Sequence, residues 1–319
     1  MADVYTQTSG VDYDSTAWNM RAWYALRPRL IFDQFATVST SPVSTPGSAV
    51  KFAFAADLAA AVTPLTEIVT PDSVAITDTT VTLNLAEYGN VVKLTRYLQA
   101  TSFIPFDPIA ANVVGFNAGL SMDNLARTAL TAGTQVVYSD VTTHVTRVTQ
   151  ASTDIISSTR VRYIAAKLDA ANVMPLEGGM YVGVIHPDVA YDLRSATDLA
   201  GWRAANTYVN TALIQNGEMG EYEGVRFIKS SDSPILTNAG VTTTDVYQTV
   251  FFGQDALAKG YATGENATGP YPQVRPGPVV DPLYRFAPMG WYWLGVFGIL
   301  RDSAVYRLET ASSIGANAS

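Results

Sequence analysis

Two histidines and one cluster of carboxylates are the side chains in this sequence whose types and spacing suggest chemistry. His186 begins the tripeptide His186-Pro187-Asp188 after an apolar run, and His144 lies in a polar, Thr-rich stretch. A histidine can act as a general base or as a metal ligand. Here, however, the tripeptide joins a predicted strand to a predicted helix, so His186 or Asp188 is predicted to cap that helix. His144 is predicted to be exposed rather than catalytic.

The carboxylates Glu218, Glu221 and Glu223 are close together in the segment NGEMGEYEG. Paired carboxylates are what glycoside hydrolysis requires, but a Gly-rich acidic loop is more typical of a solvated turn. The sequence contains no G-x-S-x-G, G-x-x-x-x-G-K or D-x-D-x-D-G motif, so it lacks the signatures of a serine nucleophile, a phosphate loop and a calcium loop. We therefore predict no catalytic residue, no cofactor site and no metal site, in a protein that is not an enzyme.

The composition points away from nucleic-acid binding and toward contacts between subunits. The formal net charge is −8, whereas binding phosphates requires a basic surface. Only 15% of the residues are charged and 48% are hydrophobic, which suits a surface covered by neighbouring copies. The many aromatic residues could instead form a stacking platform, so a soluble β-rich protein that binds or hydrolyses glycans remains an alternative.

The absence of cysteine fits synthesis in a reducing bacterial cytoplasm. The first residues have neither the basic nor the apolar region of a signal peptide, so no secretion is expected. The apolar stretch at residues 289–300 is shorter than the roughly 20 residues that a membrane helix needs. We therefore expect no membrane span.

A long β excursion is predicted over residues 50–95. Val81, Leu83 and Leu85 alternate with polar residues at the strand period, and the segment is rich in Val and Thr. An isolated two-stranded hairpin is marginal in water, so this one is expected to lie on a partner. We also expect that residues 46–93 can be replaced by a short linker without unfolding the rest.

The other elements are predicted from helical and strand periods and from turn residues. Helices are predicted at 16–26, 108–132, 157–172 (capped by Ser157 or Ser158), 254–260 and from Pro187 onward. Strands are predicted at 180–185, 224–230, 246–253 and on both sides of the turn at 301–303. A Ser/Thr/Pro/Gly hinge is predicted at 39–48 and a Gly/Pro-rich linker at 260–282.

The order of these elements resembles the Hong Kong 97 coat-protein fold of tailed-bacteriophage major capsid proteins. The local sequence is similar to the branch typified by the coat protein of coliphage N-four. The matching segments are LRPRLIFDQFA, VTLNLAEYGNVVKLT, FDPIAANVVGFNAG, YVGVIHPDVAYDLR, NGEMGEYEGVRFIKSS, VFFGQDALAKGYA and DPLYRFAPMGWYWLGVFGILRDSAVYRLETAS. The patterns FFG-x-DAL and DP-x-x-R-x-x-x-x-GW are the most specific, because they combine rare residues at fixed spacing.

The resemblance implies an α+β fold with five parts. These are an N-terminal arm (1–38), an E loop (39–95), a P domain with a spine helix (96–156), an A domain (157–269) and P-domain return strands (270–319). It implies a structural subunit whose pentamers and hexamers form an icosahedral head around double-stranded DNA, without sequence-specific binding. Decoration, scaffold and portal proteins are the further partners implied, and the implied location is the virion capsid. An encapsulin shell, which has the same fold, remains an alternative.

Seven residues are candidates for structural or intersubunit contacts under this resemblance: Trp18, Trp23, Lys51, Val81, Leu83, Leu85 and Trp291. Lys51 is near the base of the excursion and is the candidate for a crosslinking lysine, although no Lys–Asn pair can be assigned. Trp291 is expected to be buried, because its strand is apolar.

Overall fold

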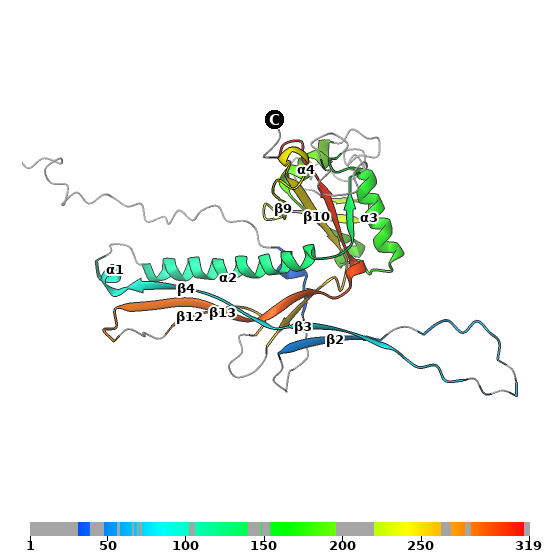
Figure 1. Ribbon diagram of the computed structural model, residues 1–319, viewed down its shortest axis with the longest axis horizontal. Coiled ribbons are helices and arrows are strands. Elements are labelled where there is room, and N and C mark those ends of the chain that lie inside the picture. Colours follow the sequence, from blue (N-terminus) through cyan, green and yellow to red (C-terminus); the bar gives the residue numbers. More distant parts are fainter. Residues whose placement is uncertain are drawn as a thin grey trace, which may run out of the picture.

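The computed structural model describes residues 31–38, 48–55, 58–65, 67–68, 70, 72–101, 106–139, 148, 154–195, 220–262, 269–277 and 282–315 (Figure 1). Its strands form three sheets, of seven, five and two strands. No helix within these residues is long and apolar enough to cross a membrane. Four short 3-10 turns complete the described elements: η1 (Asp33–Phe35), η3 (Glu177–Gly179), η4 (Val241–Thr243) and η5 (Asp302–Ala304).

The seven-stranded sheet forms the core of one lobe. Its strands are β5 (Val136–Tyr138), β6 (Tyr181–Ile185), β7 (Glu221–Tyr222), β8 (Val225–Lys229), β9 (Ile235–Leu236), β10 (Val246–Phe252) and β14 (Val305–Thr310). Their order is β5-β14-β10-β6-β8-β7, with β9 also paired to β10. Every residue of β6 and β10 is buried, which fits the apolar run of β6, while β10 also buries the polar Gln248 and Thr249. The helices α3 (Ser158–Ala170) and α4 (Pro187–Ser195) contribute apolar side chains to the same core.

The five-stranded sheet is built around the long strand β13 (Phe286–Ile299). Strand β4 (Ala86–Thr95) pairs with one side of β13, and β11 (Leu257–Tyr261) and β12 (Gln273–Pro276) pair with the other, while β1 (Thr37–Val38) extends the sheet beside β11. The short helix α1 (Arg96–Thr101) follows β4 directly. The 26-residue helix α2 (Phe106–Thr131) lies along this sheet (Figure 1). The apolar core between α2 and this sheet consists of Val114, Ala118, Met122, Trp291 and Trp293.

The two-stranded sheet is a hairpin of β2 (Ala49–Ala55) and β3 (Asp78–Asn84), which extends away from the rest of the chain (Figure 1). Only its base packs on the five-stranded sheet. There a Cβ at Gly260 would lie 3.1 Å from Val50 Cγ2, and Leu83 lies against Gly298. The glycines of β11 and β13 therefore make room for the side chains of the hairpin base.

The strongest periodic predictions are confirmed. Helix α2 and helix α3 fall within two residues of the predicted ranges, and the Ser157 side chain accepts a hydrogen bond from the Arg160 N–H at 3.3 Å, as expected for an N-cap. Beyond the end of α3, Asn172 adopts a positive φ of 52°, a conformation typical of the residue that ends a helix. Strand β6 and helix α4 meet at His186-Pro187, as predicted.

Three element predictions are wrong. Residues 254–260 do not form a helix, because Ala256 and Leu257 lead into strand β11, which pairs with β13. The excursion over 50–95 is not a single hairpin, because β4 pairs with β13 over ten residues and so belongs to the five-stranded sheet. The two terminal strands do not share a sheet, because β14 pairs with β10 in the other lobe. The predicted linker at 260–282 also contains the short strand β12.

Candidate assembly surfaces

The His186-Pro187-Asp188 tripeptide begins helix α4. The Nδ1 atom of His186 accepts a hydrogen bond from the Asp188 N–H at 3.2 Å, which confirms the predicted capping role. Burial lowers the pKa of His186, although the Asp188 carboxylate, 3.4 Å away, acts in the opposite direction. The Asp188 carboxylate also accepts a hydrogen bond from the Tyr247 hydroxyl at 2.8 Å. The tripeptide therefore joins helix α4 to strand β10, and both side chains have structural partners.

Of the three residues in the carboxylate cluster, the structure describes Glu221 and Glu223. Glu221 is exposed on β7, and Glu223, at a positive φ of 50° in the following turn, pairs with Arg162 at 2.9 Å. Glu218 and His144 lie outside the described residues. Within the part of the chain that the structure describes, no three His, Cys, Asp or Glu residues are grouped so that they could hold a metal ion.

The candidate residues for intersubunit contacts in the β2–β3 hairpin lie toward the base of the hairpin. Val81 and Leu83 on β3, and Leu85 just beyond it, are half-buried, whereas Lys51 is exposed on β2 opposite Thr82. The contact of Leu83 with Gly298 in the five-stranded sheet of the same chain was not foreseen. Trp18 and Trp23 lie outside the described residues.

The distal part of the hairpin carries apolar side chains that face solvent. Ile68 is 93% exposed and Val62 is 86% exposed. The other exposed apolar residues of this tip are Leu58, Leu65, Val74 and Ile76. Large apolar side chains that gather in an exposed segment are typical of an interaction site. We refer to the described residues of 58–77 as the hairpin tip.

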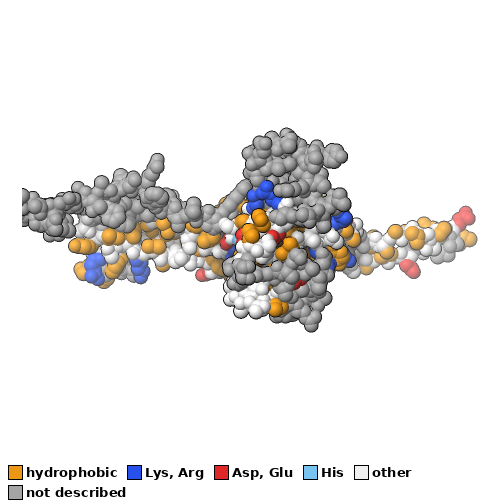
Figure 2. All heavy atoms as spheres, turned by 90° about the horizontal axis from the view of Figure 1, so that it is seen from above, with side chains coloured by type: hydrophobic (Ala, Val, Ile, Leu, Met, Phe, Trp, Pro, Cys, Tyr) orange, Lys and Arg blue, Asp and Glu red, His pale blue; other side chains and the backbone are white. Residues whose placement is uncertain are grey.

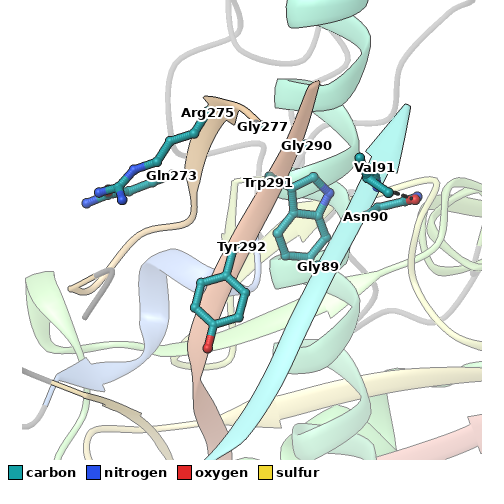
Figure 3. Close-up of a pocket in the computed structure, with 9 residues that line it drawn as sticks. All are labelled: Gly89, Asn90, Val91, Gln273, Arg275, Gly277, Gly290, Trp291 and Tyr292. Carbon is teal, nitrogen blue, oxygen red and sulfur yellow. Dashed lines mark hydrogen bonds between the residues drawn. The ribbon is translucent and has the colours of Figure 1, made fainter. Parts of the chain in front are cut away.

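A second surface is a groove between β4, β12 and β13, with a volume of about 370 Å³. It is lined by Gly89, Asn90, Val91, Gln273, Arg275, Gly277, Gly290, Trp291 and Tyr292 (Figure 3). Gly89 and Gly290 have backbones so close to the neighbouring strand that a Cβ on either would lie 2.8 Å from a carbonyl oxygen. The two glycines therefore allow the backbones of β4 and β13 to approach closely at the floor of the groove. Sequence reasoning missed this groove, although glycines inside two predicted strands are a signal of close approach.

Trp291 lies at the edge of this groove and points toward α2. It is 5% exposed, and its Nε1–H donates to Asn117 Oδ1 at 2.8 Å. Asn90 Nδ2 donates to the same oxygen at 3.3 Å. The burial expected from the apolar sequence is therefore present, and the hydrogen bond satisfies the one polar atom of the indole. Tyr292, the next residue, points to the opposite face of the sheet and is 40% exposed.

A buried polar cluster attaches the start of the described chain to α2 and β11. The Phe32 and Asp33 N–H groups donate to Asp123 Oδ1 at 2.6 and 3.2 Å. The Lys259 ammonium pairs with the Asp33 carboxylate at 2.7 Å and lies 4.6 Å from the centre of the Tyr271 ring. Burial raises the pKa of Asp123, and the two backbone N–H groups oppose this shift. Sequence reasoning did not identify this cluster, because its members are far apart in the chain.

Two substitutions of Asp123 should distinguish the effect of its hydrogen bonds on stability from the effect of its charge. Because the pKa is raised above the usual 3.8, the stabilising contribution of this group is fully present below pH 3.8 and is lost as the pH rises through the folded-state pKa. Asp123→Asn should therefore be more stable than the wild type at neutral pH, and this gain should shrink in acid. Asp123→Ala should lose about 1–3 kcal/mol, because two buried N–H groups lose their acceptor. Urea unfolding of the unassembled subunit measures both effects, and a destabilised Asn variant at neutral pH would contradict the prediction.

The comparisons with known proteins agree with this architecture. A family model described as "Phage capsid protein" matches residues 33–305. The chain is similar to the capsid of Ralstonia phage GP4, with a TM-score of 0.74 and 16% identity over 97% of this chain and 98% of that one. It is also similar to the capsid structure of cyanophage P-SCSP1u, with a TM-score of 0.72 and 15% identity over 95% and 94% of the two chains. No curated protein matches the sequence.

The structural likeness confirms the Hong Kong 97-like α+β fold, since both similarities cover nearly the whole of each chain. The family match covers most of the sequence and disfavours both the encapsulin and the glycan-binding alternatives. The exposed apolar tip and the groove are surfaces of the kind that a shell subunit requires. The chain belongs to the phage capsid protein family, and it is a major capsid protein that forms the shell of the virion.

Proposed function

We propose that this major capsid protein assembles as pentamers and hexamers into an icosahedral head that encloses double-stranded DNA, and that it catalyses no reaction. The observation that carries this proposal is the hairpin tip, whose apolar side chains are left in solvent by the single chain. A neighbouring copy that covers them would remove this apolar surface from water. The net charge of −8 fits a shell along which DNA must slide during packaging.

Each part of the chain has a proposed role in this assembly. The hairpin β2–β3 is the E loop, which lies over a neighbouring subunit. The five-stranded sheet with α2 is the P domain, and the seven-stranded lobe is the A domain, which gathers around the fivefold and sixfold axes. Support for this division comes from the sheet pairings, in which β4 pairs with β13 and β14 pairs with β10. The arm before residue 39 contributes Trp18 and Trp23 to contacts between subunits.

The finer identity of the protein is also proposed. The sequence segments that resemble the coat protein of coliphage N-four favour that branch of the fold, with synthesis in the cytoplasm of a bacterial host. Decoration, scaffold and portal proteins are the partners that this assignment implies. Lys51 is exposed at the hairpin base and is the crosslinking candidate.

Assembly is expected to require neither a metal ion nor a disulfide, because the chain has no cysteine and the described residues contain no cluster of metal ligands. The purified protein should elute from a sizing column as capsomers or megadalton particles, and a chelator and a reductant should leave this profile unchanged. Electron microscopy should show shells. A monodisperse monomer at high protein concentration, even with a lysate that supplies scaffold, would contradict the proposed function.

A further inference from the structure

Helix α2 contributes to both large apolar cores of the subunit. Met122 packs in the core of the five-stranded sheet, whereas Ala126, one turn further along, packs in the core of the seven-stranded lobe. Figure 1 shows the same helix running along the five-stranded sheet and reaching the seven-stranded lobe at its C-terminal end. Two charged residues of the helix, Asp123 and Arg127, are at this crossing between the lobes.

Arg127 ties the helix to the seven-stranded lobe. Its Nη1–H group donates to Asp232 Oδ1 at 2.7 Å and to the Asp232 carbonyl oxygen at 2.6 Å. Asp232 is in the turn that follows strand β8, and its N–H donates to Ser230 Oγ at 3.1 Å. The Arg127 and Asp232 side chains remain 25% and 18% exposed. A rotation of the arginine side chain can therefore break this tie without opening an apolar core.

The same arginine has a second carboxylate at the spacing of an ion pair within a helix. Asp123 precedes Arg127 by four residues, and side chains at i and i+4 lie on one face of a helix. Asp123 Oδ1 accepts the N–H groups of Phe32 and Asp33, but Asp123 Oδ2 is buried without a hydrogen-bond partner among the described residues. An unpaired buried oxygen is costly. Asp123 therefore lacks the partner that its position on the helix could provide.

The two carboxylates compete for one cation. Burial, and to a smaller extent the charge of Asp232, raises the pKa of Asp123, so its ionised form is disfavoured while Arg127 stays on Asp232. Lys259, which lines the same cavity as Asp123, is held by Asp33 at 2.7 Å. Only 15% of the residues are charged, and Figure 2 shows charged side chains scattered among hydrophobic and uncharged ones. Arg127 is therefore the cation best placed to pair with either carboxylate.

We propose that Arg127 is a two-position latch between the two lobes of the subunit. In the tied position, which the structure shows, it holds Asp232 and so fixes the turn after β8 against α2. In the released position it pairs with the ionised Asp123 of its own helix, and the seven-stranded lobe can shift against α2. The partly exposed Asp232 is then paired with water. This latch is a property of the single subunit and does not rest on assembly.

The effect of Asp123→Asn on stability tests the latch, because the sign of the effect depends on the position of Arg127. In the wild-type background the substitution should raise the urea midpoint of the unassembled subunit at pH 7, since the buried carboxylate is not paired with Arg127. In an Asp232→Asn background Arg127 pairs with Asp123, so Asp123→Asn should lower the midpoint.

Two further backgrounds show whether Arg127 causes this reversal. In Asp232→Asn/Arg127→Met the substitution Asp123→Asn should raise the midpoint again, although by less than in the wild type, because the charge of Asp232 is gone. The matched control is Glu223→Gln, which removes the carboxylate partner of another arginine, Arg162, in the same lobe. In that background Asp123→Asn should raise the midpoint as it does in the wild type.

Hydrogen exchange of the turn at 230–233 reports the latch without an Asp232 variant. In this turn the Ser233 N–H donates to the Ser230 carbonyl oxygen at 3.3 Å, and Arg127 holds the turn in the tied position. Asp123→Asn removes the released position, so the turn should exchange more slowly than in the wild type at pH 7. Arg127→Met should make exchange faster, and Glu223→Gln should leave it unchanged.

A static ion pair between Arg127 and Asp232 predicts a different pattern. Asp123→Asn would then raise the urea midpoint in the Asp232→Asn background too, and it would leave exchange at 230–233 at the wild-type rate. Either observation would overturn the latch. The proposed shell function would stand in that case, because neither measurement involves assembly, and a wild-type chain that forms no shells would count against that function alone.

Discussion

Replacing residues 56–77 with a short Gly/Ser linker should abolish shells and leave the subunit folded. The removed segment contains the exposed tip, including Val62 and Ile68, so its loss exposes almost no core. Ala55 and Asp78 are directly opposite each other in the hairpin, so a tight turn can join β2 to β3 without changing their register. Both strands and the contacts of the hairpin base remain. The replacement removes the surface that, in the proposed function, a neighbouring subunit covers.

Circular dichroism and electron microscopy of this variant measure the two effects separately. The melting temperature should stay near that of the wild-type subunit, while sizing and micrographs should show monomers or small oligomers. A wider replacement of residues 46–93 serves as the contrast, because it also removes most of β4, whose Tyr88 ring stacks on Trp293 at 5.8 Å. That wider variant should unfold. Intact shells from the narrow replacement would show that the hairpin tip is not needed for assembly.

The wider replacement is expected to unfold because the sequence does not reveal that β4 belongs to the five-stranded sheet. Strand β4 follows β3 with only Leu85 between them, and the alternation through Val81, Leu83 and Leu85 shifts by one residue to the half-buried Ala86 and Tyr88. Alternation with a period of two residues identifies a strand but not the strand with which it pairs. The chain changes sheets at Leu85, whose N–H donates to the Ser48 carbonyl at 2.9 Å. No Gly or Pro lies between Val81 and Tyr88, so the shift in the alternation is the only mark of this change in the sequence.

Helices were predicted more accurately than strand partners, and the reason is physical. Helix α3 is specified by its own residues, namely the Ser157 cap and the apolar face of Val161, Ile164 and Leu168. Strand β11 is specified by what surrounds it. The short apolar run that includes Leu257 fits a helix or a strand equally well, and the choice is made by pairing with β13.

The two candidate assembly surfaces also differ in how far the sequence predicts them. Exposed aliphatic residues in a thin hairpin could be recognised from composition and from the weakness of an isolated hairpin. The groove could not, because it depends on Gly89 and Gly290 lying in adjacent strands whose pairing the sequence does not reveal. The charge of the groove depends on Arg275 of β12, which pairs with Gly290 of β13. Both residues are distant in sequence from β4.

Trp291→Ala should destabilise the subunit by about 3–5 kcal/mol, because it removes a large buried aromatic side chain. The indole packs in the cluster with Val114, Ala118 and Met122, and its loss also takes a hydrogen bond from Asn117. A domain is typically stable by only about 5–15 kcal/mol, so this variant should be largely insoluble or should unfold at much lower urea concentration.

The neighbouring residue provides the control for this prediction. Tyr292→Ala removes an aromatic ring from the same strand, but the ring is 40% exposed on the outer face of the sheet. This variant should keep nearly the wild-type urea midpoint, because the exposed ring contributes less buried apolar surface. The two substitutions, one residue apart, therefore compare the two faces of the sheet, since alternate side chains of β13 face α2 and the groove. A soluble Trp291→Ala subunit with wild-type stability would show that the packing of α2 on β13 does not support the fold.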